Sequence, residues 1–95
     1  MDIVYASLTR RRASQDPPPG EISEIVGALW AHATSADGLQ YASGRSRTDR
    51  VDLLLYLLTP AVPVPGTEHR VSALLGRCHR ASRKLQQDYL PPPHP

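Results

Sequence analysis

Arginine side chains are the clearest candidates for chemistry in this sequence. Ten of the eleven basic residues are Arg, and only Lys84 is Lys. A guanidinium group presents a planar fork of donors that suits a carboxylate or a phosphate. We expect six arginines to converge at one end of the fold and to bind an anion or an acidic partner: Arg10, Arg11, Arg12, Arg45, Arg47 and Arg50. The alternative is a solvated rim, in which four acidic residues pair with some of these arginines: Asp16, Glu21, Asp49 and Asp52.

Other residue types offer little catalytic or metal chemistry. Cys78 and His79 are adjacent, so on a helix their side chains would point about 100° apart and would not readily share a metal ion. The sequence also lacks the paired Cys or His spacing of a structural zinc site. Asp49 and Asp52 are interpreted as polar positions of a hairpin rather than as an acid–base pair. The sequence therefore predicts no metal site, no cofactor and no catalytic set, and we expect a protein that is not an enzyme.

The strongest structural signal is the apolar run from Val51 to Leu58, which only Asp52 interrupts. Its eight residues are far fewer than the roughly 20 that a membrane-spanning helix needs, so no membrane segment is predicted. Its Val, Leu and Tyr content favours a strand buried at the centre of a sheet. A polar turn at 44–49 separates this run from the shorter extended stretch at 39–43, and this arrangement predicts a hairpin. Its two strands are expected over 39 to about 45 and over 50–58.

The remaining elements follow from periodicity. Alternation over 2–9 predicts a first strand, and apolar residues at helical spacing predict helices over 21–34 and 67–89. Thr67 is the expected N-cap of the second helix, and Gly38 is expected to adopt a left-handed conformation after the first helix. Residues 1–90 form one predicted domain, and 91–95 form a proline-rich tail or the start of a linker.

The order strand–helix–strand–strand–helix predicts an α+β fold. The most apolar strand should be central, which gives a sheet order of 1-3-2 with both helices on one face. This topology is the ferredoxin-like arrangement without its fourth strand. The first strand is then expected to have a free edge, because the missing strand would have paired with it. Four large side chains are expected to form an apolar interface on the opposite face of the sheet: Leu54, Tyr56, Leu58 and Tyr5.

Composition suggests the cellular setting. The high Arg, Ala, Leu and Pro content with a single Lys is typical of a GC-rich bacterial genome. The single cysteine fits a reducing compartment, and no secretory signal is recognised at the N-terminus. The expected location is therefore the cytoplasm.

These observations predict a small non-catalytic interaction module, either an adaptor or a dimerisation domain. Its partner would be another protein or, as a homodimer, a second copy of the chain, bound through the apolar sheet face and the free strand edge. One alternative is a nucleic-acid or phosphate-ligand binding domain that uses the arginines 10–12 and 45–50, although the sequence has no Phe and no aromatic RNA-binding motif. Another alternative is a small ferredoxin-like enzyme formed on dimerisation.

Overall fold

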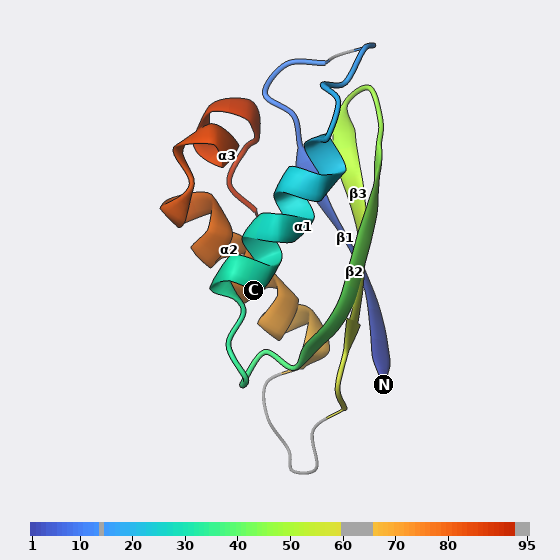
Figure 1. Cartoon of the computed structure of the whole chain (residues 1–95), viewed down its shortest axis with the longest axis vertical. Coiled ribbons are helices and arrows are strands. Elements are labelled where there is room, and N and C mark those ends of the chain that lie inside the picture. The colour runs from blue at the N-terminus through green and yellow to red at the C-terminus, as the bar shows by residue number, and fades with distance from the viewer. Residues whose placement is uncertain (14, 60–65, 93–95) are drawn as a thin grey trace.

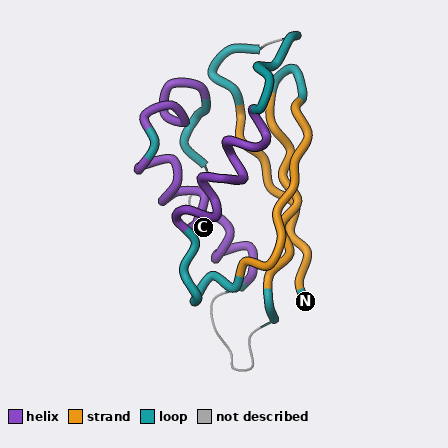
Figure 2. Tube along the Cα trace, in the orientation of Figure 1, coloured by secondary structure: helices purple, strands orange, loops and turns teal. Residues whose placement is uncertain are grey.

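The chain folds into a three-stranded antiparallel sheet with helices packed against one of its faces (Figure 1). The computed structural model describes residues 1–13, 15–59 and 66–92. The elements follow the order β1 (Asp2–Thr9), α1 (Glu21–His32), β2 (Leu39–Ser46), β3 (Arg50–Leu57), α2 (Thr67–Ala81) and α3 (Arg83–Asp88). Figure 2 shows the two layers, with the strands on one side and the helices on the other. The predicted α+β class and the 1-3-2 strand order are confirmed.

β3 is the central strand because it is the strand that can be buried along its length. It pairs antiparallel with both β1 and β2. Its side chains alternate strictly between the two faces of the sheet. The helix-facing set is at most 2% exposed and consists of Val51, Leu53, Leu55 and Leu57. The other set lies on the opposite face, which we call the open face.

The helices cover the sheet through one apolar stripe each. α1 contributes Ile25 and Leu29, and α2 contributes Val71, Leu74 and Leu75, all buried. α1 contacts β2 while α2 contacts β1, so each helix lies over a different edge strand. The buried side chains of both helices and all three strands belong to a single hydrophobic core.

The predicted second helix over 67–89 is wrong as one element, because the chain breaks at Ser82. This residue has an extended conformation (φ −115°, ψ 114°) between α2 and α3. Its backbone N–H still donates to the Cys78 carbonyl, while its hydroxyl oxygen accepts from the Leu85 N–H as the N-cap of α3. Serine is among the best N-cap residues, so it can end one helix and begin the next.

Thr67 is not the N-cap of α2, contrary to the sequence prediction. The N-cap is Gly66, and Thr67 is the first helical residue. The Thr67 hydroxyl instead donates to Asp2 Oδ2 at 2.7 Å, and this hydrogen bond lowers the pKa of Asp2. The hydroxyl therefore joins α2 to the first residue of β1. Gly38 has the left-handed conformation that the sequence predicts (φ 70°).

The edge of β1 is paired at its C-terminal end. Arg10 and Tyr89 form an antiparallel bridge, in which the Leu90 N–H donates to the Thr9 carbonyl (2.9 Å) and the Arg11 N–H donates to the Asp88 carbonyl (3.0 Å). The prediction of a free edge is therefore wrong at this end of the strand. Of the predicted tail, residues 91 and 92 are described, and 93–95 lie outside the described residues.

Candidate interaction surface and arginine groups

The open face carries aromatic and aliphatic side chains from all three strands. Ile3 of β1 and Tyr41 of β2 both lie opposite Tyr56 of β3. The rings of Tyr41 and Tyr56 meet edge to face, with centroids 5.4 Å apart and planes at 75°. Ile3 is 53% exposed and Tyr41 is 54% exposed. These three side chains form a continuous apolar row across the sheet.

Further apolar side chains flank this row. Tyr5 lies opposite Leu54 in the next row and is 81% exposed. Leu58, directly after β3, is 51% exposed at the other side of the row. We define the apolar patch as the set of six residues Ile3, Tyr5, Tyr41, Leu54, Tyr56 and Leu58. Contiguous exposed apolar surface of this kind commonly marks an interaction site.

Tyr41 joins the apolar patch because of a β-bulge that the sequence does not reveal. Leu39 pairs with Leu57, but Tyr41 pairs with Tyr56, so the register shifts between these two positions. Strict alternation from the buried Leu39 would place Tyr41 in the core. The extra residue, Gln40, moves Tyr41 to the open face instead.

The hairpin end of the open face is charged. Asp52 accepts from the side chains of Arg50 (2.8 Å) and Arg47 (3.2 Å). It also accepts from the Ser7 hydroxyl at 3.2 Å. The hydrogen bond from Arg50 is the main reason that the pKa of Asp52 is lowered. Arg45 lies opposite Asp52 on β2, yet its guanidinium makes no ion pair with any residue in the described part of the chain.

Arg10 is buried on the helix side of the sheet. Its guanidinium forms a two-pronged ion pair with Glu21, the first residue of α1, with Nη2 at 2.7 Å from Oε1. Its Nε also donates to the Arg47 carbonyl at 3.0 Å. Glu21 accepts further hydrogen bonds from the hydroxyls of Ser46 (2.7 Å) and Tyr89. We call these four residues the Glu21 cluster: Arg10, Glu21, Ser46 and Tyr89.

The environment of the Glu21 cluster shifts the pKa values of two of its groups, Glu21 and Tyr89. Burial raises the pKa of Glu21, but the hydrogen bonds from Arg10, Tyr89 and Ser46 outweigh burial and lower it to about 2. Burial, followed by the hydrogen bond to Glu21, raises the pKa of the Tyr89 hydroxyl. The cluster therefore holds a carboxylate and a neutral phenol at neutral pH, and it joins β1, α1, β2 and the residue that follows α3. The sequence identifies Glu21 as one possible acidic partner of the arginines, but it gives no signal that Arg10, Ser46 and Tyr89 all meet this carboxylate.

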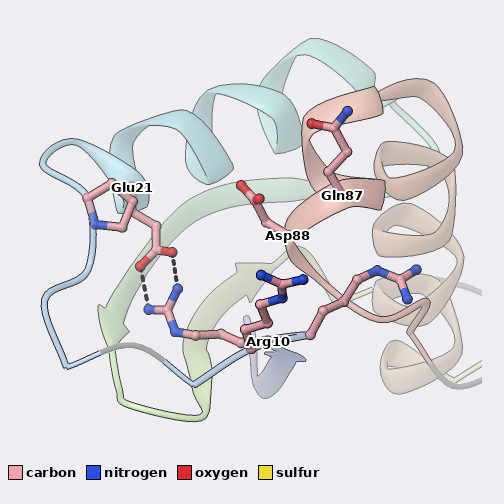
Figure 3. A pocket seen from close by; sticks show the side chains of 7 residues that line it. Arg10, Glu21, Gln87 and Asp88 are labelled. Atoms are coloured by element: carbon pink, nitrogen blue, oxygen red, sulfur yellow. Dashed lines mark hydrogen bonds and ion pairs between the residues drawn. The ribbon is translucent and has the colours of Figure 1, made fainter.

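Arg11 and Arg12 lie beside the Glu21 cluster, around a hollow of about 450 Å³. Figure 3 shows this hollow, with the Arg10–Glu21 pair on one side and Gln87 and Asp88 on the other. Arg11 Nε donates to the Gln86 carbonyl at 2.7 Å. The lining carries both signs of charge, because Glu21 and Asp88 face the same space as the arginines.

The six arginines of the predicted rim thus form two groups. Arg10 to Arg12 lie around the hollow of Figure 3 near the start of α1. The other three lie at or near the charged hairpin end, where Arg47 and Arg50 pair with Asp52. The guanidinium of Arg10 is already paired with the Glu21 carboxylate. Binding of an anion or an acidic partner by the remaining arginines stays a prediction.

Cys78 is a buried core residue, 2% exposed, as its place on the α2 stripe indicates. Burial raises the pKa of its thiol to about 11. Within residues 1–13, 15–59 and 66–92, no group of three or more His, Cys, Asp or Glu side chains is placed to hold a metal ion. No helix in this part of the chain has the length and apolar character needed to cross a membrane.

Comparison of the chain with protein-family models, with curated proteins and with solved structures found no match.

Proposed function

We propose that this chain is a non-catalytic protein interaction module that forms a homodimer through the open face of its sheet. The observation that carries the proposal is the apolar patch, in which Tyr5 is 81% exposed and Ile3, Tyr41 and Leu58 are each more than half exposed. Burying a large apolar side chain contributes about 1.5–3 kcal/mol relative to leaving it in water. A second copy would supply this burial for several side chains of the patch at once.

The layout of the open face supports a second copy as the occupant. Homodimers usually have two-fold symmetry, so the same surface must fit itself. A two-fold axis parallel to β3 would bring Tyr56 against its own copy and Ile3 towards Tyr41 of the partner. The apolar rows of the two copies would then coincide. The charged hairpin ends would lie at the periphery, where Arg45 remains available to orient the partner.

A ferredoxin-like arrangement without a fourth strand is part of this proposal. The 1-3-2 sheet order and the helices on one face support it. In such a sheet, none of the described helices covers the open face, and face-to-face packing of two sheets at about 10 Å is a common way to cover it. Binding of nucleic acid or a phosphate ligand by the arginines is the alternative function. It predicts an affinity that falls steeply with salt, whereas an apolar interface does not.

Sedimentation velocity across micromolar concentrations tests the homodimer. The wild type should show a mass that rises with concentration towards that of two copies. Replacing Tyr56 by Asp places a charge in the centre of the patch, so the variant should remain folded and monomeric. The matched control is Trp30→Asp, because Trp30 is also an exposed aromatic side chain, 47% exposed, but lies on α1 in the helix layer. This control should associate like the wild type.

A wild type that stays monomeric at every concentration would overturn the homodimer. Equal loss of association in the Trp30 and Tyr56 variants would show that the contact does not use the open face. Circular dichroism and the urea midpoint of each variant establish that it is folded, so that loss of association is not confused with unfolding.

A further inference from the structure

The open face contains a hollow where its apolar and charged halves meet. The hollow has a volume of about 450 Å³, which is within the range of small-molecule sites. Its lining comes from all three strands, chiefly Tyr5, Ser7, Ser43, Arg45, Asp52 and Leu54. It is separate from the hollow around Arg11 and Arg12, which lies near the start of α1.

Small side chains at two positions, in different rows and on opposite sides of β3, create this hollow. Ser43 lies opposite Leu54 on one side of β3, and Ser7 lies opposite Asp52 on the other. The neighbours of these serines in the same rows are the larger Tyr5 and Arg45. Large side chains at Tyr5 and Arg45 therefore stand at diagonal corners, and the two serines leave space between them.

The two sides of the hollow have different chemistry. The Tyr5 ring and the Leu54 side chain provide an apolar wall. The polar part of the lining consists of the hydroxyls of Ser7 and Ser43, the carboxylate of Asp52 and the guanidinium groups of Arg45 and Arg47. Arg47 and Arg50 already share Asp52, whereas Arg45 pairs with no acidic residue among those the structure describes. The unmatched charge at the polar side is therefore positive.

We propose that this hollow binds a small aromatic carboxylate, with the ring against Tyr5 and Leu54 and the carboxylate on Arg45. Offset or edge-to-face contact with Tyr5 favours an aromatic ring over a chain of similar size. The Arg45 fork provides paired donors for the two carboxylate oxygens. The Ser43 hydroxyl is the neighbouring donor, while the Ser7 hydroxyl donates to Asp52.

This site belongs to a single chain, so it does not require the proposed homodimer. On the two-fold axis proposed above, Tyr5 of a second copy would lie over Ser43, so the ligand and the second copy compete for the hollow. The binding test therefore uses a protein concentration at which sedimentation shows a monomer, and this separates the two proposals. Saturable binding to the monomer supports the site whether or not the homodimer forms.

The test uses 3-phenylpropionate as the probe and ¹H–¹⁵N NMR shifts of the full chain as the readout. Saturable shifts should occur at β1 and β2 residues around the hollow, including Ser7, Ser43 and Arg45. The neutral amide, 3-phenylpropionamide, should bind roughly three- to fivefold more weakly, because an exposed ion pair contributes a modest amount. Acetate, which lacks the ring, should cause no saturable shifts.

Two variants and two matched controls locate the site. Ser43→Leu fills the hollow and should abolish the saturable shifts, whereas Ser23→Leu, at an exposed position on α1, should leave them unchanged. Arg45→Gln should weaken the acid to the level of the amide. Arg83→Gln removes an exposed arginine of α3 and should not change binding of either compound.

Absence of saturable binding by the acid would overturn the proposal. Equal affinity for the acid and the amide would also overturn it, because Arg45 would then make no contribution to binding of the carboxylate. Unchanged binding in a folded Ser43→Leu protein would place the ligand elsewhere on the molecule.

Discussion

Tyr89 donates a hydrogen bond from its hydroxyl to the carboxylate of Glu21, across a sequence separation of 68 residues. Both side chains are buried, at 3% and 6% exposure. This contact fastens the residue after α3 to the first turn of α1. The break at Ser82 is what allows it, because the short α3 turns the chain back towards β1 and its bridge with Arg10.

Replacing Tyr89 by Phe removes this donor and keeps the ring. The Glu21 carboxylate, a charged acceptor, then loses one of the hydrogen bonds that it accepts, so the free energy of unfolding should fall by about 1.5–3 kcal/mol. Urea denaturation at pH 7 is the measurement. Tyr5→Phe is the control, because the exposed Tyr5 hydroxyl has no such role and its loss should leave the urea midpoint unchanged. Equal effects of the two substitutions would contradict the assigned contact.

Replacing Glu21 by Gln leaves the buried Arg10 guanidinium without its carboxylate. Removal of one partner of a buried ion pair typically costs about 3–5 kcal/mol of stability. We therefore expect a large decrease in the urea midpoint, or partial unfolding at 37 °C. Glu24→Gln tests the same change on the exposed side of α1, where the side chain is 60% exposed, and it should have little effect.

The stability that Glu21 contributes should depend on pH in a defined window. The pKa of Glu21 is lowered from the ordinary value of 4.5 to about 2 in the folded chain. A carboxylate with a lowered folded pKa stabilises the fold fully above its unfolded pKa and loses this contribution as the pH falls towards its folded pKa. The stability difference between the wild type and Glu21→Gln should therefore be constant above about pH 5 and shrink between 4.5 and 2. A difference that does not change over this window would refute the assignment.

Leu55 tests the central position of β3. Its side chain is completely buried, so Leu55→Ala should cost about 2–5 kcal/mol of the free energy of unfolding. Leu58→Ala, at the 51% exposed position of the apolar patch, should have a much smaller effect on the folding of the monomer. Chemical denaturation measures both at a protein concentration below that of any association. A decrease in the free energy of unfolding of less than about 1 kcal/mol for Leu55→Ala would contradict the placement of this side chain in the core.

Replacing Arg45, Arg47 and Arg50 together by Gln separates the interaction module from its nucleic-acid alternative. The three side chains are exposed, so the urea midpoint should stay close to that of the wild type. Under the proposed function, affinity for a single-stranded 20-nucleotide DNA should be low and the substitution should barely change it. Tight, salt-dependent binding that the triple variant loses would instead favour the alternative.

The sequence predicts the central strand because the run from Val51 to Leu58 is short, rich in Val, Leu and Tyr, and too apolar for an edge strand. Its two faces then follow from the alternation of side chains along any strand. Tyr41 could not be placed in the same way, because the bulge at Gln40 arises from pairing with β3 and leaves no local signal. The sequence does not reveal the break at Ser82, because the helical spacing of apolar residues continues through it. Leu85 and Tyr89 would be buried in one continuous helix, and they are also buried in the observed structure.

The candidate sites, like the fold, could be predicted from the sequence only in part. The apolar patch could be inferred in part, since Leu54, Tyr56, Leu58 and Tyr5 follow from the alternation of side chains along a strand. The arginines and their acidic partners Glu21, Asp49 and Asp52 could be identified by residue type, but which arginine pairs with which carboxylate could not. The pairing of Arg10 with Glu21 depends on how the loop before α1 returns to the end of β1, and no spacing rule contains that geometry.

Pro91 and Pro92, which follow Leu90, determine how far the sheet can be extended. Continuing the Arg10–Tyr89 pairing would place residue 92 opposite Ser7, at a position that needs a backbone donor towards β1. Residue 91 would direct its backbone groups away from β1, towards any further strand. Both residues are Pro and have no N–H to donate. The segment therefore caps the end of β1, yet it neither extends the hydrogen-bonded ladder along that strand nor offers a donor at residue 91 from which an additional chain could continue the sheet.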